Sequence, residues 1–170
     1  EPGATVTVNG SAATVDAEGK FSHIITLSEG TNTITVAATN TIGTHTKTQK
    51  VVLDTIPPAI GSLSPSDNTT IGKQRQIYVS ASDNNRIELI EIQVSTDDGE
   101  NWHTFASIYG YTSYYYDWDT MADIEGIGEI ADGTYKFRAI AHDWAGNISN
   151  GTPVRIWTLD RTAPAPPSGL

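Results

Sequence analysis

Apolar and polar residues alternate in short runs along the whole chain, and clusters of Gly, Asn, Asp and Pro separate the runs. A period of two residues is typical of a β-strand with one buried face, whereas an amphipathic helix has a period of about 3.6. In the N-terminal third, the alternation predicts strands at residues 4–8, 12–15, 21–27, 31–38 and 45–53. Asn9-Gly10, between the first two runs, is a favoured pair for a two-residue hairpin turn.

The remaining sequence continues the alternation with longer and more apolar runs. The predicted inward faces are Ile77, Val79 and Ala81; Ile90, Ile92 and Val94; Tyr114, Tyr116 and Trp118; and Tyr135, Phe137, Ala139 and Ala141. A last strand is expected through Val154, Ile156 and Thr158. Residues 121–131 interrupt the pattern with acids and glycines, and we expect a solvated loop there. The pattern as a whole predicts an all-β chain.

Two internal echoes indicate a tandem pair of domains. Residues 132–147 align with residues 29–44, which places an acid followed by Gly at the start of each copy. The Leu-Asp pair at 159–160 likewise echoes the pair at 53–54. Self-similarity at a fixed spacing is typical of an array of small domains.

We therefore expect one domain at residues 1–56, a second at 57–164, and a linker to a following domain at 165–170. Pro57 and Pro58 fix φ and remove two amide donors, which predicts a short and semi-rigid connection between the domains. A β-sandwich usually has about seven strands. The shorter strand list of the first domain predicts that it lacks one or two N-terminal strands, and the alternative is a smaller complete fold.

Several motifs resemble known domain families. Residues 15–21 (VDAEGKF) and 27–34 (LSEGTNTI) resemble bacterial Ig-like domains, in particular the accessory module of glucodextranase-type glycosidases and of bacterial surface proteins. Residues 143–147 (DWAGN), with 116–120 (YDWDT), resemble a fibronectin-III-like or Ig-like repeat. The first copy departs from that turn at residues 40–44 (NTIGT). The resemblance implies two tandem Ig-like β-sandwiches, of which the first is N-terminally truncated.

Charge and composition narrow the range of partners. The formal net charge is -10, Cys is absent, and no apolar run reaches transmembrane length. An acidic surface repels phosphate backbones and anionic membranes, so we expect neither nucleic-acid binding nor membrane insertion. Divalent cations are better suited to such a surface.

Three acids and one amide are expected at one pole of the second sandwich. In an Ig-type sandwich, the start of the first strand, the B–C loop and the F–G loop share a pole. On the predicted strand order these segments carry Asp54, Asp83, and Asp143 with Asn147. Carboxylate and amide oxygens are the ligands that Ca²⁺ prefers, so Ca²⁺ is the candidate ion, and its binding would stiffen the interdomain angle. The alternative is that Asp143 accepts amide hydrogen bonds within its own Asx turn, while Asp54 and Asp83 are solvated.

Residues 95–102 (STDDGENW) resemble the Asp-box hairpin of sialidases and other β-proteins, with Asn101 in place of the usual Thr. In that motif the Asp, here Asp97, caps turn amides, and the Trp, here Trp102, packs beneath the turn. The resemblance implies a folding device.

The aromatic residues of the second domain offer a candidate glycan site. If Tyr114, Tyr116 and Trp118 face the core, Tyr109, Tyr111 and Tyr115 remain as surface platforms. Exposed aromatic rings stack on sugars, and neighbouring acids accept hydrogen bonds from the sugar hydroxyl groups. The alternative is that these tyrosines are core and packing residues.

Catalytic motifs are not found in the sequence. The four histidines have no metal-ligand spacing, and neither a nucleophile elbow nor a phosphate-binding Gly loop occurs. We expect no enzyme, but a non-catalytic extracellular or cell-surface spacer or adhesion module of a larger bacterial surface or secreted protein. Its partners would be the neighbouring domains and a cell-surface glycan or protein. The alternative is a carbohydrate-binding accessory module of a secreted glycoside hydrolase.

Overall fold

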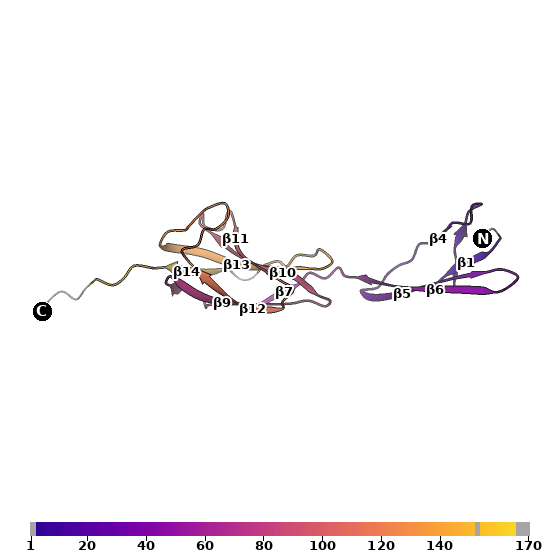
Figure 1. Cartoon of the computed structure of the whole chain (residues 1–170), viewed down its shortest axis with the longest axis horizontal. Helices are drawn as coiled ribbons and strands as arrows, with labels where there is room; N and C mark the ends of the chain where they lie inside the picture. The colour runs from indigo at the N-terminus through magenta and orange to yellow at the C-terminus, as the bar shows by residue number, and fades with distance from the viewer. Residues whose placement is uncertain (1–2, 152–153, 166–170) are drawn as a thin grey trace. The chain divides into compact units, whose positions relative to one another are not determined.

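The computed structural model describes residues 3–151 and 154–165. The chain divides into two units, Glu1–Thr55 and Ile56–Leu170, and each regular element of the described residues is a β-strand (Figure 1). The all-β prediction is therefore confirmed. Within these ranges, no helix has the length and apolar character needed to cross a membrane. Of the linker predicted at 165–170, only Ala165 lies among the described residues.

The first unit is built on an antiparallel sheet with the strand order β2-β1-β5-β6, next to a two-stranded sheet of β3 and β4. The strands are β1 (Thr5–Val8), β2 (Ser11–Ala12), β3 (Thr14–Val15), β4 (Phe21–Ser22), β5 (Gly30–Thr39) and β6 (Thr44–Leu53). The predicted hairpin turn has positive φ at both Asn9 (49°) and Gly10 (84°), as a type I′ turn requires. Among the described residues of this unit, Val6 and Val8 are the buried apolar side chains.

The strand predicted at residues 21–27 is shorter in the structure, because β4 ends at Ser22. His23, Ile25 and Leu27 are half-buried and their neighbours are exposed, so the predicted alternation is present from His23 on. Phe21, the first residue of the predicted row, is 47% exposed. However, β3 pairs only with Phe21 and Ser22, and no described strand pairs with residues 23–27. A strand is defined by the hydrogen bonds to its partner. Alternation therefore predicts which side chains are covered, but not whether a ladder forms.

Two sheets form the second unit. The larger has the order β11-β10-β13-β14-β8 and the smaller β12-β9-β7. The strands are β7 (Ala59–Ser64), β8 (Thr69–Ile71), β9 (Gln74–Ser82), β10 (Ile87–Ser95), β11 (His103–Tyr109), β12 (Ser113–Asp119), β13 (Gly133–Asp143) and β14 (Arg155–Leu159). The strands pair antiparallel except for β14 with β8. This two-sheet arrangement is an Ig-like sandwich, as predicted.

The inward faces predicted for β9, β10 and β13 are confirmed. Their fully covered apolar residues are Ile77, Val79, Ile90, Ile92, Val94, Phe137, Ala139 and Ala141. At the centre, the ring of Phe137 stacks on Trp157 with 4.4 Å between centroids. Burying an aromatic side chain of this size contributes about 1.5–3 kcal/mol, so these rings are a main source of the stability of the unit.

The last strand has the opposite parity to the one predicted. In β14, Trp157 and Leu159 are buried, whereas Ile156 and Thr158 are half-buried. A shift of one residue exchanges the two faces of a strand. The prediction followed the β-branched residues of this run and missed the indole, which fills the core.

Residues 121–131 are not a solvated loop, contrary to the prediction. Ile124 and Ile130 are only 3% and 5% exposed and belong to the hydrophobic core. An isolated bridge between Ile124 and Gly128 closes the turn between them. The acids of the loop face outward, and its three isoleucines extend the core, since Ile127 is partly buried against the cluster that contains Ile124 and Ile130.

The Asp-box hairpin has the predicted geometry. The Asp97 Oδ1 accepts hydrogen bonds from the Asn101 backbone N–H (2.8 Å) and the Ser95 hydroxyl (2.8 Å), and Oδ2 accepts one from Asn101 Nδ2 (2.6 Å). The Trp102 indole N–H donates to the Gly99 carbonyl at 3.1 Å. The Asn101 backbone bond is the largest of the effects that lower the pKa of Asp97 from 3.8 to about 2. Asn101 therefore replaces the usual Thr by donating twice to one carboxylate.

We expect Asp97→Asn to flatten the acid limb of the stability curve. Because the folded state lowers the pKa of Asp97, its stabilisation is complete above about pH 4 and is lost as the pH falls through about 2. Thermal melts between these pH values should show a steeper fall for the wild type than for Asp97→Asn. Glu100→Gln, in the same turn, is the control and should keep the wild-type slope. Equal slopes for the wild type and Asp97→Asn would contradict the role of Asp97.

Ile130→Ala should lower the free energy of unfolding by about 2–5 kcal/mol, because it leaves a cavity in the core. Urea titration of the whole chain measures this change. Met121→Ala alters the exposed part of the same loop and should stay within about 0.5 kcal/mol of the wild type. A similarly small effect of Ile130→Ala would show that the loop is solvated after all.

Candidate functional site

Two of the predicted cation ligands lie together in the second unit. Asp83 follows β9 and Asp143 ends β13, and carboxylate oxygens of the two lie within 4.8 Å of each other. Oδ2 of Asp83 accepts hydrogen bonds from the backbone N–H groups of Asn85 (2.8 Å) and Arg86 (2.9 Å). Its Oδ1 is buried and has no hydrogen-bond partner among the described residues. A buried carboxylate oxygen in this state is costly unless a cation or a donor satisfies it.

Asp143 is fully buried and is held by its own turn. Its Oδ1 accepts hydrogen bonds from the backbone N–H groups of Ala145 and Asn147. Its Oδ2 accepts one from Asn147 Nδ2, and all three distances are 2.8 Å. Burial by itself would raise the pKa of Asp143, but the hydrogen bonds from Asn147 and Ala145 outweigh it and leave the pKa lowered. Asp143 and Asn147 thus form the Asx turn of the alternative interpretation, and that turn keeps an anionic carboxylate beside Asp83.

Asp54 belongs to the first unit, where it directly follows β6. Its membership of this group stays a prediction.

The candidate tyrosines have different partners. The ring of Tyr115, in the middle of β12, lies 4.8 Å from the ring of Tyr78, and the ring of Tyr111 lies 5.3 Å from that of Tyr114. Tyr109 ends β11, in the larger sheet. Successive residues of a strand point to opposite faces, so the pairs at Tyr114 and Tyr115 occupy two different faces of β12.

The inward row predicted for β12 is correct only in part. Trp118 is 2% exposed and Tyr116 is half-buried, but Tyr114 is 40% exposed. Tyr114 is near the beginning of the strand, where its ring packs on Tyr111 of the preceding connection.

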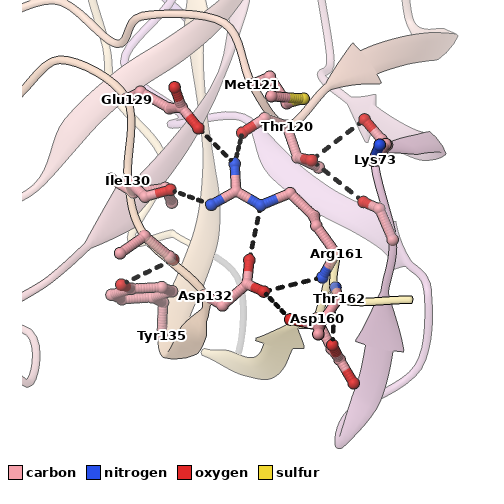
Figure 2. A network of polar contacts seen from close by, with 12 residues as sticks. Lys73, Thr120, Met121, Glu129, Ile130, Asp132, Tyr135, Asp160, Arg161 and Thr162 are labelled. Atoms are coloured by element: carbon pink, nitrogen blue, oxygen red, sulfur yellow. Dashed lines mark hydrogen bonds and ion pairs between the residues drawn. The ribbon is translucent and has the colours of Figure 1, made fainter. Parts of the chain in front are cut away.

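A polar network that the sequence did not predict holds the chain where it leaves the second unit (Figure 2). Arg161 Nε donates to Asp132 Oδ1 at 2.6 Å, and the Arg161 backbone N–H donates to Asp132 Oδ2 at 3.0 Å. The guanidinium also reaches the carbonyls of Thr120 (3.0 Å) and Ile130 (2.8 Å) and the carboxylate of Glu129 (2.8 Å). The Arg161 side chain is only 11% exposed. Arg161, two residues past the end of β14, thus joins the exit segment to the loop at residues 121–131.

The two charges at the centre of this network stabilise each other. Hydrogen bonds from Arg161 lower the pKa of Asp132, and the side-chain hydrogen bond to Asp132 raises the pKa of Arg161. Both groups are therefore ionised across the neutral and mildly acidic range.

The first unit has a counterpart at the same place in its own strand order. Glu29 accepts the Thr55 backbone N–H at 3.1 Å and the Thr55 hydroxyl at 2.9 Å. Glu29 and Asp132 each precede the Gly that begins the second-to-last strand of their unit. Thr55 and Arg161 each stand two residues after the Leu that ends the last strand. We call each of these pairs, Glu29 with Thr55 and Asp132 with Arg161, an exit clamp.

Several solved structures resemble the chain at low identity. Latent PorU from Porphyromonas gingivalis is 16% identical, with a TM-score of 0.44, over 94% of this chain and 16% of that chain. An I-band fragment of titin is 13% identical, with a TM-score of 0.46, over 93% of this chain and 54% of that chain. SGBP-B of Bacteroides ovatus, in complex with a mixed-linkage heptasaccharide, is 14% identical, with a TM-score of 0.28, over 92% and 38%. The chain spans less than two thirds of each of these structures.

Comparison with curated proteins finds no match. The family model described as glucodextranase, domain B, matches residues 2–55. The resemblance predicted for the first unit is therefore confirmed: it is similar to an Ig-like domain of accessory type.

Proposed function

We propose that the chain is a non-catalytic extracellular spacer that positions neighbouring domains of a larger bacterial surface or secreted protein. The observation that carries this proposal is the exit clamp, which occurs in both units. A domain that only needs to be stable can let its chain end freely. A domain that sets the direction of its neighbour must hold the residues by which the chain leaves.

The chemistry of the clamp suits that task. A carboxylate that accepts a backbone N–H makes a charge-assisted bond, roughly twice as strong as a neutral one. In each unit the bond holds the main chain of the exit residue, at Thr55 and at Arg161. Prolines follow shortly, at Pro57 and Pro58 after the first clamp and at Pro164 after the second. Since proline fixes φ, the clamped residue and the proline together restrict the path of the connecting segment.

The packing of the second unit also favours a non-catalytic role. Its interior is filled by side chains of both sheets, including Trp118, Phe137 and Trp157. An enzyme site needs a cleft with convergent polar groups, and the polar networks at Asp97, Asp143 and Asp132 each close a turn or an exit. These networks support the architecture of the unit.

Removing the clamp carboxylate should loosen the exit and leave the core intact. In Asp132→Ala, the Arg161 amide loses its acceptor, and its hydrogen exchange measured by NMR should accelerate at least about tenfold. The amides of β13 and β10 should keep their protection. Glu125→Ala removes an exposed acid from the same loop and is the control. Unchanged protection of the Arg161 amide in Asp132→Ala would refute the clamp.

The spacer role itself is tested by solution scattering of the whole chain. We expect the wild type to give a narrow distribution of conformations and Glu29→Ala to give a broader one, because the Thr55 exit is then released. Glu18→Ala, which removes an exposed acid of the same unit, should behave like the wild type. A wild type as variable as Glu29→Ala would count against a spacer.

We further propose that Ca²⁺ binds at Asp83 and Asp143, with Asn147 and the predicted ligand Asp54. The buried Oδ1 of Asp83 and the ionised carboxylate of Asp143 support this proposal. A divalent cation would offset the repulsion between them and prefers oxygen ligands of this kind. Bound there, the ion would stiffen the turns after β9 and β13.

Millimolar CaCl₂ should raise the melting temperature of the chain relative to EDTA. With a dissociation constant of about 0.1 mM, as in extracellular modules, 5 mM Ca²⁺ contributes about 2 kcal/mol, a shift of several degrees. Asp83→Asn keeps an acceptor for the amides of Asn85 and Arg86 but removes the charge, and it should lose most of the shift. Equal melting temperatures in CaCl₂ and EDTA would exclude the site.

A further inference from the structure

The outer face of the smaller sheet carries an ordered strip of side chains along β9 and β12. Alternate residues of the two strands are directly paired, and these residues share the face away from the core. From one end to the other, the paired rows are Ser113 with Ser80, Tyr115 with Tyr78, Asp117 with Gln76, and Asp119 with Gln74. We call these four rows the outer strip. Between these rows, Ile77, Val79 and Trp118 are buried.

The aromatic row of the outer strip is accessible and rigidly supported. Tyr115 is 62% exposed, and its ring lies 4.8 Å from that of Tyr78 at an interplanar angle of 42°. Both tyrosines stand on strands that pair over the whole length of β12. Two rings held in this way lose little side-chain entropy when a ligand lies on them.

A polar groove continues the strip beyond the tyrosines. Its volume is about 350 Å³, and it is lined by Gln74, Arg75, Gln76, Asp117, Trp118 and Asp119. Gln76 Nε2 donates to Asp117 Oδ1 at 2.9 Å, which fixes the amide and the carboxylate relative to each other. In the neighbouring row, Asp119 Oδ1 accepts the Met121 N–H at 3.0 Å. The groove therefore offers carboxylate acceptors and amide groups in positions set by the sheet.

The chemistry of the strip decides between classes of ligand. Arg75 is the one cation among the described residues that line the groove, and Asp117 and Asp119 outnumber it. Together with the net charge of -10, these two acids would repel a nucleic acid or another polyanion. A protein partner usually needs an apolar centre around its aromatic anchors, but the rows beside the tyrosines are serines, glutamines and aspartates. A neutral sugar has both features that the strip matches: an apolar C–H face for an aromatic ring, and hydroxyl groups that donate to carboxylates and bond with amides.

We propose that the outer strip binds a neutral oligosaccharide. One sugar unit stacks on the Tyr115 and Tyr78 rings, and the next units extend along the groove, where their hydroxyl groups bond to Gln76 and Asp117. This function goes beyond positioning. A spacer with such a strip also holds its parent protein close to a polysaccharide.

Affinity electrophoresis of the whole chain tests the proposal. The probes are four soluble neutral polysaccharides cast into native gels: a starch glucan, a β-glucan, a xylan and a mannan. We expect at least one of them to retard the wild type. Tyr115→Ala should weaken that binding at least about tenfold, because the sugar loses the aromatic ring on which it stacks. Tyr115→Phe keeps the ring and should remain close to the wild type.

Two controls make the result decisive. Tyr109→Ala removes a tyrosine of similar exposure (66%) from the larger sheet and should bind normally. Asp117→Asn changes the groove without touching the rings and should also weaken binding, so it replaces Tyr115→Ala if that variant does not fold by circular dichroism. The proposal is overturned if no probe retards the wild type, if both strip variants bind normally, or if Tyr109→Ala is as weak as they are.

Discussion

The second unit depends on the packing of Phe137 against three other aromatic rings. Its ring stacks on Trp157 and meets Trp118 and Phe105 at centroid distances of 5.6 and 6.1 Å. These four residues come from β13, β14, β12 and β11, so one cluster joins both sheets. The Trp157 N–H donates to the Ser66 carbonyl at 3.2 Å, which satisfies the polar atom of the buried indole. The cluster therefore sets the place of β14, and with it the point at which the chain leaves the unit.

The exit clamp follows from that placement. Once Trp157 and Leu159 are buried, the chain emerges beside the beginning of β13, because Gly133 pairs with Leu159. Asp132 directly precedes Gly133, so the pairing of Gly133 with Leu159 already places it within hydrogen-bond distance of Arg161. The same register recurs in the first unit, where Gly30 pairs with Leu53. An acid before this Gly is thus well placed to bind the residue that follows the last strand, and both units have one there.

Much of the fold could be predicted from the sequence, because it depends on local alternation. The rows at Ile77 and Ile90 were predicted correctly, since a period of two marks one covered face whatever the partner strand is. The Asp97 turn was also predicted, because its hydrogen bonds join residues at most four positions apart. Alternation failed where the tertiary partner decides the outcome. β4 ends at Ser22, beyond which no described strand pairs with the chain. The inward face of β14 is the one that carries Trp157 and Leu159, and not the one with the β-branched Ile156 and Thr158.

The candidate sites also differ in how far the sequence predicts them. Asp83 and Asp143 were placed at one pole by the order of strands, which is a property of the topology. Arg161 and Asp132 are 29 residues apart, and no spacing rule connects them. The sequence points to this contact only through the acid-Gly pair that begins each aligned copy. That pair shows that the acid recurs at an equivalent position, but it does not show which residue the acid contacts. The outer strip was hidden for a similar reason. Tyr78 is recognised as part of a binding surface only from the strand register, which places it opposite Tyr115. The side chains of the outer strip lie outside the core, so they can be substituted without disturbing the packing between the two sheets. A structural module can therefore carry a binding surface on this face and keep its fold.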